Sequence, residues 1–168
     1  MSDSQMQRGQ KWLEELLRLM KIPAKVKAEQ RTTIVEQEED PEPDSYWLTI
    51  DETQLTPAQI QILIGAEGAT LDAIQYLANA ILNMDREHEE QAAYTIELNG
   101  YRLRRQAELR ALAEHAVQQV RSNGLEFEIS ALSAAERRQI HTFLKEYTDM
   151  ESYSRGKEPD RRLVVRLR

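Results

Sequence analysis

Two glycines separated by two residues are the first feature of the sequence that could do chemistry. The loop Gly65-Ala66-Glu67-Gly68 lies between two apolar stretches with helical spacing, 57–64 and 69–82. Glycine has no Cβ atom, so a second backbone can come close to this loop. The loop also precedes a helix, whose first N–H groups and positive dipole end favour a phosphate. It is therefore a candidate contact for a nucleic-acid backbone; a tight interhelical turn without a ligand is the alternative.

An arginine and a histidine four residues apart form a second candidate site. Arg137 and His141 lie on a predicted helix that begins after Ser133. At about 100° per residue they share one flank of that helix, beside its apolar stripe, so we expect both to be partly supported and still to reach solvent. The planar guanidinium group of Arg137 can bind a phosphate. His141 can donate to a phosphate or stack on a base, and its charge depends on pH.

More cations and one aromatic ring accompany this pair. The cations expected around it are Arg138, Lys145, Arg155, Lys157 and Arg161. Tyr153 is a candidate ring for base stacking, with packing as the equal alternative. Three arginines of the next helix upstream are candidates for phosphate contacts, or simply solvated: Arg102, Arg104 and Arg105. Nothing in the set would specify bases, so it predicts binding of flexible single strands through their charge.

The first hundred residues predict the elements that position the glycine loop. Apolar residues at helical spacing over 4–20 predict a helix that Pro23 ends. Apolar and polar residues alternate over 24–35 and 46–50, as in half-buried strands. The acidic segment 36–45 between these strands is expected to be a solvated loop.

The glycine loop itself is expected to join two helices. Thr56, Pro57 and Gln59 predict a capped helix that ends at Gly65. The following helix is expected to bury six apolar side chains: Leu71, Ile74, Leu77, Ala78, Ile81 and Leu82. A strand over 93–98 completes the order α-β-β-α-α-β, which would most simply build a three-stranded sheet with helices on one face.

The last third of the chain predicts the elements around Arg137. A long helix over 101–120 and a short strand over 125–129 come first. Ser133 and Glu136 form a capping box that opens the next helix. A loop over 152–160 is then followed by a terminal strand of alternating apolar and arginine residues.

Composition limits the classes of protein that need consideration. The chain has no cysteine, and its three histidines show no metal-ligand spacing, so we expect neither disulfides nor a bound metal. No stretch approaches 18 apolar residues and no secretion signal begins the chain, so a soluble, cytoplasmic protein without membrane insertion is expected. The net charge is −7, but it is unevenly distributed. Residues 1–100 carry 8 basic and 19 acidic side chains, and residues 101–168 carry 14 and 10, so the second part can present a basic face.

Four segments in order resemble one protein family. They are LIGAEGATLDAIQYLAN, GYRLRRQAELRALAEHA, ERRQIH and SYSRGKEPDRRLVV. Over about residues 8–168 the series resembles the bacterial Jag family, also called KhpB or SpoIIIJ-associated protein. The resemblance implies an α+β fold: a type II KH domain over 1–100, whose GxxG loop is 65–68, joined by a long helix to a small α/β R-three-H domain within 101–168. It also implies RNA binding, no cofactor, and pairing with a small stand-alone KH protein.

Two departures from the family pattern affect the expected function. Longer members carry an additional N-terminal domain, which this sequence is expected to lack. The variable loop positions are often basic in KH domains that bind RNA, and here they are Ala66 and Glu67. A carboxylate about 4 Å from a phosphate costs roughly 1 kcal/mol in water-like surroundings, and a lysine's attraction is lost as well, so the KH contact is expected to be about tenfold weaker or more.

Three functional classes follow from these observations. The leading one is a non-catalytic binder of single-stranded RNA, or of single-stranded DNA, that acts as a post-transcriptional regulator or RNA chaperone. The second is a protein-interaction adaptor whose KH domain has lost most of its RNA affinity. The third is a nuclease with His141 as general base, which we set aside because no carboxylate or nucleophile partners His141 in the sequence.

Overall fold

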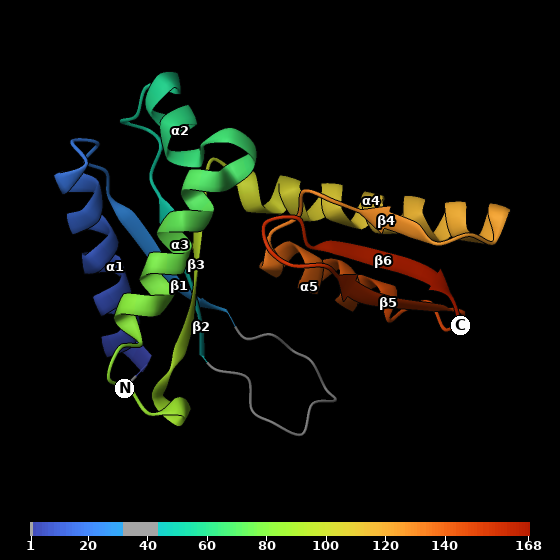
Figure 1. Ribbon diagram of the computed structural model, residues 1–168. Helices are drawn as coiled ribbons and strands as arrows, with labels where there is room; N and C mark the ends of the chain where they lie inside the picture. The colour runs from blue at the N-terminus through green and yellow to red at the C-terminus, as the bar shows by residue number, and fades with distance from the viewer. Residues whose placement is uncertain (1, 32–43) are drawn as a thin grey trace. The chain divides into compact units, whose positions relative to one another are not determined.

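The chain forms two compact units, Met1–Arg102 and Leu103–Arg168, in a computed structural model that describes residues 2–31 and 44–168 (Figure 1). Most of the predicted acidic loop over 36–45 lies outside the described residues.

The first unit has the predicted order of elements. They are α1 (Ser2–Leu19), β1 (Val26–Arg31), β2 (Asp44–Ile50), α2 (Pro57–Ile64), α3 (Ala69–Leu82) and β3 (Ala92–Leu98). Short 3-10 turns, Ala66–Gly68 and His88–Glu90, precede and follow α3. The three strands form one sheet in the order β1-β2-β3, with β1–β2 antiparallel and β2–β3 parallel.

One face of this sheet carries the core of the unit. The pairing register places Val26, Ile50 and Leu98 side by side, and all three are buried. Because side chains alternate across a strand, the buried apolar residues of all three strands share this face. Helices α1, α2 and α3 contribute buried leucines to the same core, so they cover this one face as the sequence predicts.

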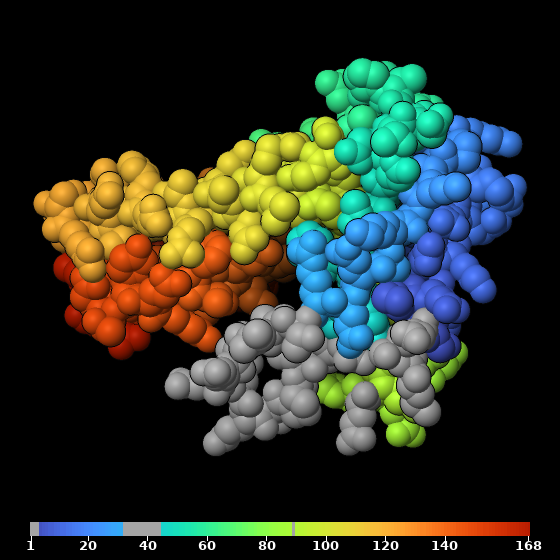
Figure 2. Space-filling model, turned by 180° about the vertical axis from the view of Figure 1, so that it is seen from behind, coloured from blue at the N-terminus to red at the C-terminus, as the bar shows by residue number. Residues whose placement is uncertain are grey.

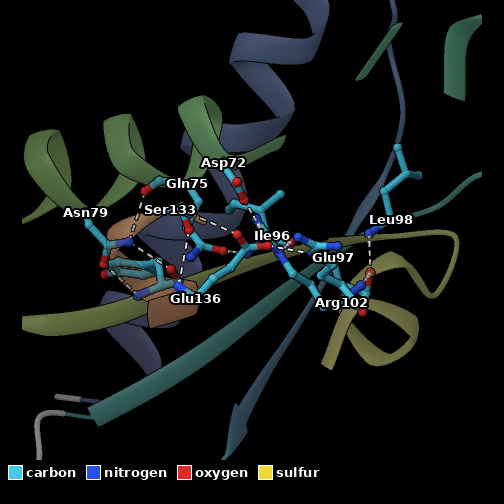
Figure 3. A network of polar contacts seen from close by, with 11 residues as sticks. Asp72, Gln75, Asn79, Ile96, Glu97, Leu98, Arg102, Ser133 and Glu136 are labelled. Carbon is cyan, nitrogen blue, oxygen red and sulfur yellow. Dashed lines mark hydrogen bonds and ion pairs between the residues drawn. The ribbon is translucent and has the colours of Figure 1, made fainter. Parts of the chain in front are cut away.

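Side-chain amides of α3 hold the free edge of β3 (Figure 3). The Tyr94 N–H donates to Asn79 Oδ1 (2.8 Å), and Asn79 Nδ2 donates to the Tyr94 carbonyl (2.8 Å). Asn83 makes the same pair of bonds with Ala92, and Gln75 Oε1 accepts from the Ile96 N–H (3.0 Å). An edge strand otherwise presents its N–H and C=O groups without partners. The amides satisfy these groups, and they fix how α3 is rotated about its axis.

The second unit packs two helices against a smaller sheet. Its elements are α4 (Tyr101–Asn123), β4 (Phe127–Ile129), α5 (Ala134–Leu144), β5 (Met150–Arg155) and β6 (Arg162–Leu167). Helix α4 begins two residues before the boundary between the units, and its outer side forms a yellow-to-orange surface in Figure 2. The strands pair in the antiparallel order β4-β6-β5. Buried residues of both helices and all three strands form the core.

The predicted helix starts are confirmed. Thr56 and Ser133 each accept from the backbone N–H three residues later, and Gln59 and Glu136 complete the two capping boxes. These boxes depend on residues within one turn of each other, which explains why the sequence could locate them.

Two predictions about regular structure are wrong. Residues 152–155, expected to belong to a loop, lie in β5, because β6 supplies the backbone partners from Met150 to Arg155. Leu77 and Ile81 of α3 were expected in the core, but they are 43% and 42% exposed.

Candidate nucleic-acid interface

A hollow of about 430 Å³ lies in the second unit between α5, β5 and β6. We call it the α5 hollow. Its lining includes five residues predicted from the sequence and one that was not. They are Arg137, Arg138, His141, Tyr153 and Arg161, and Ser152. The tertiary structure thus brings together side chains that are up to 24 positions apart in the chain.

Arg137 is buried, which contradicts the expectation that it reaches solvent. Its side chain is 7% exposed. Nη1 donates to the carbonyls of Leu132 (2.8 Å) and Arg161 (3.4 Å), and Nη2 is paired with the carboxylate of Glu158. Arg137 therefore ties the β5–β6 loop to the start of α5. Its guanidinium group is satisfied within the protein, so its place in the site is that of a positioning residue.

His141 lies on the exposed side of the hollow with its ring held from β5. Its Nδ1 is 2.6 Å from Ser152 Oγ. When the Ser152 hydroxyl donates to Nδ1, the ring proton is on Nε2, which can then donate to an anion. The prediction that no nucleophile partners His141 is wrong, because the Ser152 hydroxyl lies beside the ring. The sequence gives no signal for Ser152 because its position depends on β5.

Four of the predicted cations are exposed and have no carboxylate partner among the described residues. Arg138 and Arg161 line the hollow, Lys145 is exposed directly after α5, and Lys157 is exposed on the β5–β6 loop. None of these four side chains forms an ion pair with any other residue in the described ranges 2–31 and 44–168. Since exposed charges without partners are available to a ligand, Arg138 and Arg161 are the cations best placed to contact one at the hollow.

Tyr153 and Arg155 project from the opposite face of the sheet, which corrects their predicted place. Strand alternation separates them from Ser152, whose side chain faces α5. The Tyr153 hydroxyl donates to Glu126 (3.2 Å), and Arg155 pairs with Glu126 (3.0 Å) and Glu128 (2.9 Å). Tyr153 therefore borders the hollow, but its ring points away from it. The charge of Arg155 is neutralised by Glu128 of β4 and by Glu126, the residue before β4.

The carboxylates of this outer face give the second unit a pH-dependent stability. The Arg155 guanidinium lowers the pKa of Glu126, and the Arg162 guanidinium lowers the pKa of Glu128, because each donates a hydrogen bond to the charged form. Carboxyls with depressed pKa values contribute stability above their ordinary value of 4.5, and this stability is lost as the pH falls through the lowered values.

We therefore expect the melting temperature to fall as the pH is lowered from 5, with a shallower fall in the Glu128→Gln variant. Glutamine keeps the shape of Glu128 and cannot titrate. Circular dichroism melts across this range would measure both slopes. Equal slopes in the two proteins would show that the Glu128 ion pairs do not contribute.

The glycine loop of the first unit is a tight corner between α2 and α3. Glu67 adopts φ 53° and Gly68 φ 78°, and Ala66 and Glu67 are exposed. Gly68 is buried because the ring of Tyr101 lies against it. Helix α3 begins without a side-chain cap, and its first N–H group, that of Ala69, donates to the Ala66 carbonyl. A Cβ on Gly65 would collide with Thr70.

The three arginines at the start of α4 do not form the expected open positive surface. Arg102 pairs with Asp72 of α3, and Arg105 pairs with Glu136 (2.6 Å) and Glu108 (3.1 Å). Arg104 is exposed on α4. Two of the three predicted phosphate contacts are thus already engaged by carboxylates.

Comparison with known proteins assigns the second unit to a domain family. Residues 107–167 match the model of the R-three-H domain. The chain is 31% identical to the RNA-binding protein KhpB of Lactiplantibacillus plantarum, over 64% of this chain and 33% of that protein. It is 30% identical to proteins of the same name from Clostridium symbiosum and Bacillus subtilis, over 64% and 66% of this chain and 47% and 53% of theirs. The chain thus spans between a third and about half of the length of these relatives.

Within the described part of the chain, no helix has the length and apolar character needed to cross a bilayer.

Proposed function

The chain belongs to the Jag family, whose members include the KhpB proteins, and on this premise we propose that it binds single-stranded RNA without acting on it chemically. The relatives named above are RNA-binding proteins. The observation that carries the proposal for this chain is the α5 hollow, where Arg138 and Arg161 lie beside His141 and have no acidic partner among the described residues.

The α5 hollow would bind the sugar-phosphate backbone of the RNA. Arg138 and Arg161 each offer a guanidinium group to a phosphate oxygen, and His141, oriented by Ser152, offers a third donor through Nε2. Arg137 would act by holding the loop that carries Arg161. Phosphate contacts position a strand but carry no sequence information, so single-stranded DNA is expected to bind by the same groups.

We propose that the first unit is a type II KH domain that makes a second, weaker contact. Its order of elements and its Gly65–Gly68 corner support this assignment. The N–H groups at the start of α3 would receive a phosphate. The exposed carboxylate of Glu67 opposes that contact, so most of the affinity is assigned to the second unit. A role in the cytoplasm as a post-transcriptional regulator or RNA chaperone would use such sequence-tolerant binding.

Titration of a labelled, unstructured RNA by fluorescence anisotropy would test the proposal. We expect the Arg138→Ala/Arg161→Ala variant to bind about tenfold more weakly. The slope of log affinity against log salt concentration should become shallower by about two, because two phosphate contacts are lost. Both side chains are exposed, so the fold should survive.

A matched control removes the same charge from the outer face of the sheet. Arg162→Ala/Arg166→Ala deletes two arginines that are paired with Glu128 and Glu151. We expect this variant to bind within about twofold of wild type, since neither arginine lines the hollow. Equal weakening in both variants would mean that only net charge matters, and no weakening in either would refute the site.

The exposed carboxylate of Glu67 in the glycine loop favours a second candidate function, a protein-interaction adaptor. In this alternative the first unit pairs with a small stand-alone KH protein and does not bind RNA. Glu67→Lys separates the two, because it should strengthen RNA binding if the loop contacts a backbone and leave it unchanged if it does not. Mass measurement of the chain with and without such a partner would test the pairing.

A further inference from the structure

The main chain of β5 has an open edge in the second unit. The Arg168 N–H donates to the Asp149 carbonyl (3.1 Å), which marks these two residues as a bonded pair of β5 and β6. Bonded pairs alternate along an antiparallel ladder, so the odd-numbered residues of β5 bond to β6. Ser152 and Ser154 therefore direct their N–H and C=O groups away from β6, toward the edge of the sheet.

Hydrogen bonds satisfy only part of this edge in the described chain. The Met150 N–H donates to the Tyr147 carbonyl (3.2 Å), and the Met150 carbonyl accepts from Arg168 Nε (3.0 Å). Within the ranges 2–31 and 44–168, no residue gives a partner to the outward N–H and C=O groups of Ser152 and Ser154. In the first unit, by contrast, side-chain amides of α3 satisfy the edge of β3. The open groups of β5 are therefore available to a ligand.

The open edge forms one wall of the α5 hollow. Ser152, Tyr153 and Ser154 all line the hollow, and since the Tyr153 ring points away, that residue contributes its main chain. The same lining includes the exposed cations Arg138 and Arg161. The volume of about 430 Å³ lies within the range of small-molecule sites, about 300–1,000 Å³, and a phosphate group alone would leave most of it empty. The hollow thus has room and polar groups for more than a phosphate.

We propose that the hollow receives one unpaired base of a single strand, which the open edge of β5 binds through hydrogen bonds. The proposal rests on the RNA binding proposed above: the two arginines hold a phosphate, and the main chain of Ser152 and Ser154 holds the base. Each RNA base has a donor beside an acceptor on its Watson–Crick edge, and the edge of a strand offers both. In a duplex these base groups are already paired, so β5 selects single strands without selecting a sequence.

Substitution of Ser154 by proline tests the proposal, because proline has no N–H group. Proline is tolerated in an edge strand where the missing N–H would face outward, so the pairing of β5 with β6 is kept. We expect Ser154→Pro to bind an unstructured RNA about fivefold more weakly. Ser154→Ala is the matched control, since it loses the same hydroxyl, keeps the N–H and should bind within about twofold of wild type. Ser152 is left unchanged because it also orients His141.

An abasic strand of the same length separates the base contact from the backbone contact. It keeps every phosphate, so we expect the wild-type chain to bind it about tenfold more weakly than RNA, at low and at moderate salt alike. Ser154→Pro should bind the abasic strand as wild type does, since the lost N–H then has no base to contact. The Arg138→Ala/Arg161→Ala variant should instead lose affinity for both strands. Fluorescence anisotropy with the full chain would measure these ratios.

Several results would overturn the proposal. Equal binding of the two strands by wild type would do so, as would equal affinities of Ser154→Pro and Ser154→Ala for RNA. If both strands bind equally and the Arg138→Ala/Arg161→Ala variant weakens both, the proposed RNA binding stands and only the base contact fails. If that variant weakens neither strand, the proposed site itself fails.

The amide NMR signals of Ser152 and Ser154 in wild type give a second measurement, which decides the matter should Ser154→Pro not fold by circular dichroism. We expect both signals to shift farther with RNA than with the abasic strand, because a base bonds to these N–H and C=O groups. Equal shifts with the two strands would refute the base contact. Signals that respond only to an added peptide would make this edge a protein contact and refute the proposal as well.

Discussion

Replacement of Arg137 by alanine is expected to lower the free energy of unfolding of the second unit by about 2–4 kcal/mol. The change leaves the carbonyls of Leu132 and Arg161 without their donor and removes a side chain that is only 7% exposed. The β5–β6 loop would lose its attachment to α5. Because both tryptophans, Trp12 and Trp47, are in the first unit, unfolding should be followed by circular dichroism or hydrogen exchange.

Two controls locate the source of this loss. Glu158→Gln removes the charge of an acidic partner that is 58% exposed, and we expect it to cost under about 1 kcal/mol. Arg138→Ala removes an exposed arginine from the next position and should have a similarly small effect. If Arg137→Ala were no more costly than Arg138→Ala, the buried role of Arg137 would be wrong.

This result has a consequence for experiments on RNA binding. Loss of affinity in an Arg137 variant would arise largely from the altered loop that carries Arg161, and would not demonstrate a phosphate contact. Arg138 and Arg161 are the positions where affinity can change while the fold is kept.

Gly68→Ala is expected to lower the stability of the first unit by about 2–4 kcal/mol. Part of this cost, about 1 kcal/mol, comes from placing a Cβ at φ 78°. The rest comes from overpacking, since the new methyl group would be closer to the Tyr101 phenol than van der Waals contact allows. Chemical unfolding followed by tryptophan fluorescence would measure the loss.

Gly124→Ala provides the matched control, because Gly124 has φ 70° and open space where its Cβ would be. It should lower the stability of the second unit by the backbone cost alone, about 1 kcal/mol. Circular dichroism would measure this loss, because both tryptophans are in the first unit. Gly68→Ala should also become less costly in a Tyr101→Ala background. Equal costs at the two glycines would mean that Tyr101 does not constrain the loop.

The sequence alone determined the features that depend on neighbouring residues. The capping boxes at Thr56 and Ser133 and the α-β-β-α-α-β order followed from patterns within a few residues. The four segments that resemble the Jag family also led to the family that the comparisons support. Helical periodicity placed Arg137 and His141 on one flank of a helix, and both line one hollow.

Only the tertiary structure decided which of these side chains a ligand can reach. Arg137 and His141 share a helix flank, yet the β5–β6 loop buries the first and leaves the second exposed. The amides of Gln75, Asn79 and Asn83 likewise turn Leu77 outward, although periodicity alone would place it in the core. Periodicity describes the direction of a side chain relative to its own helix, whereas burial depends on what distant segments place in front of it.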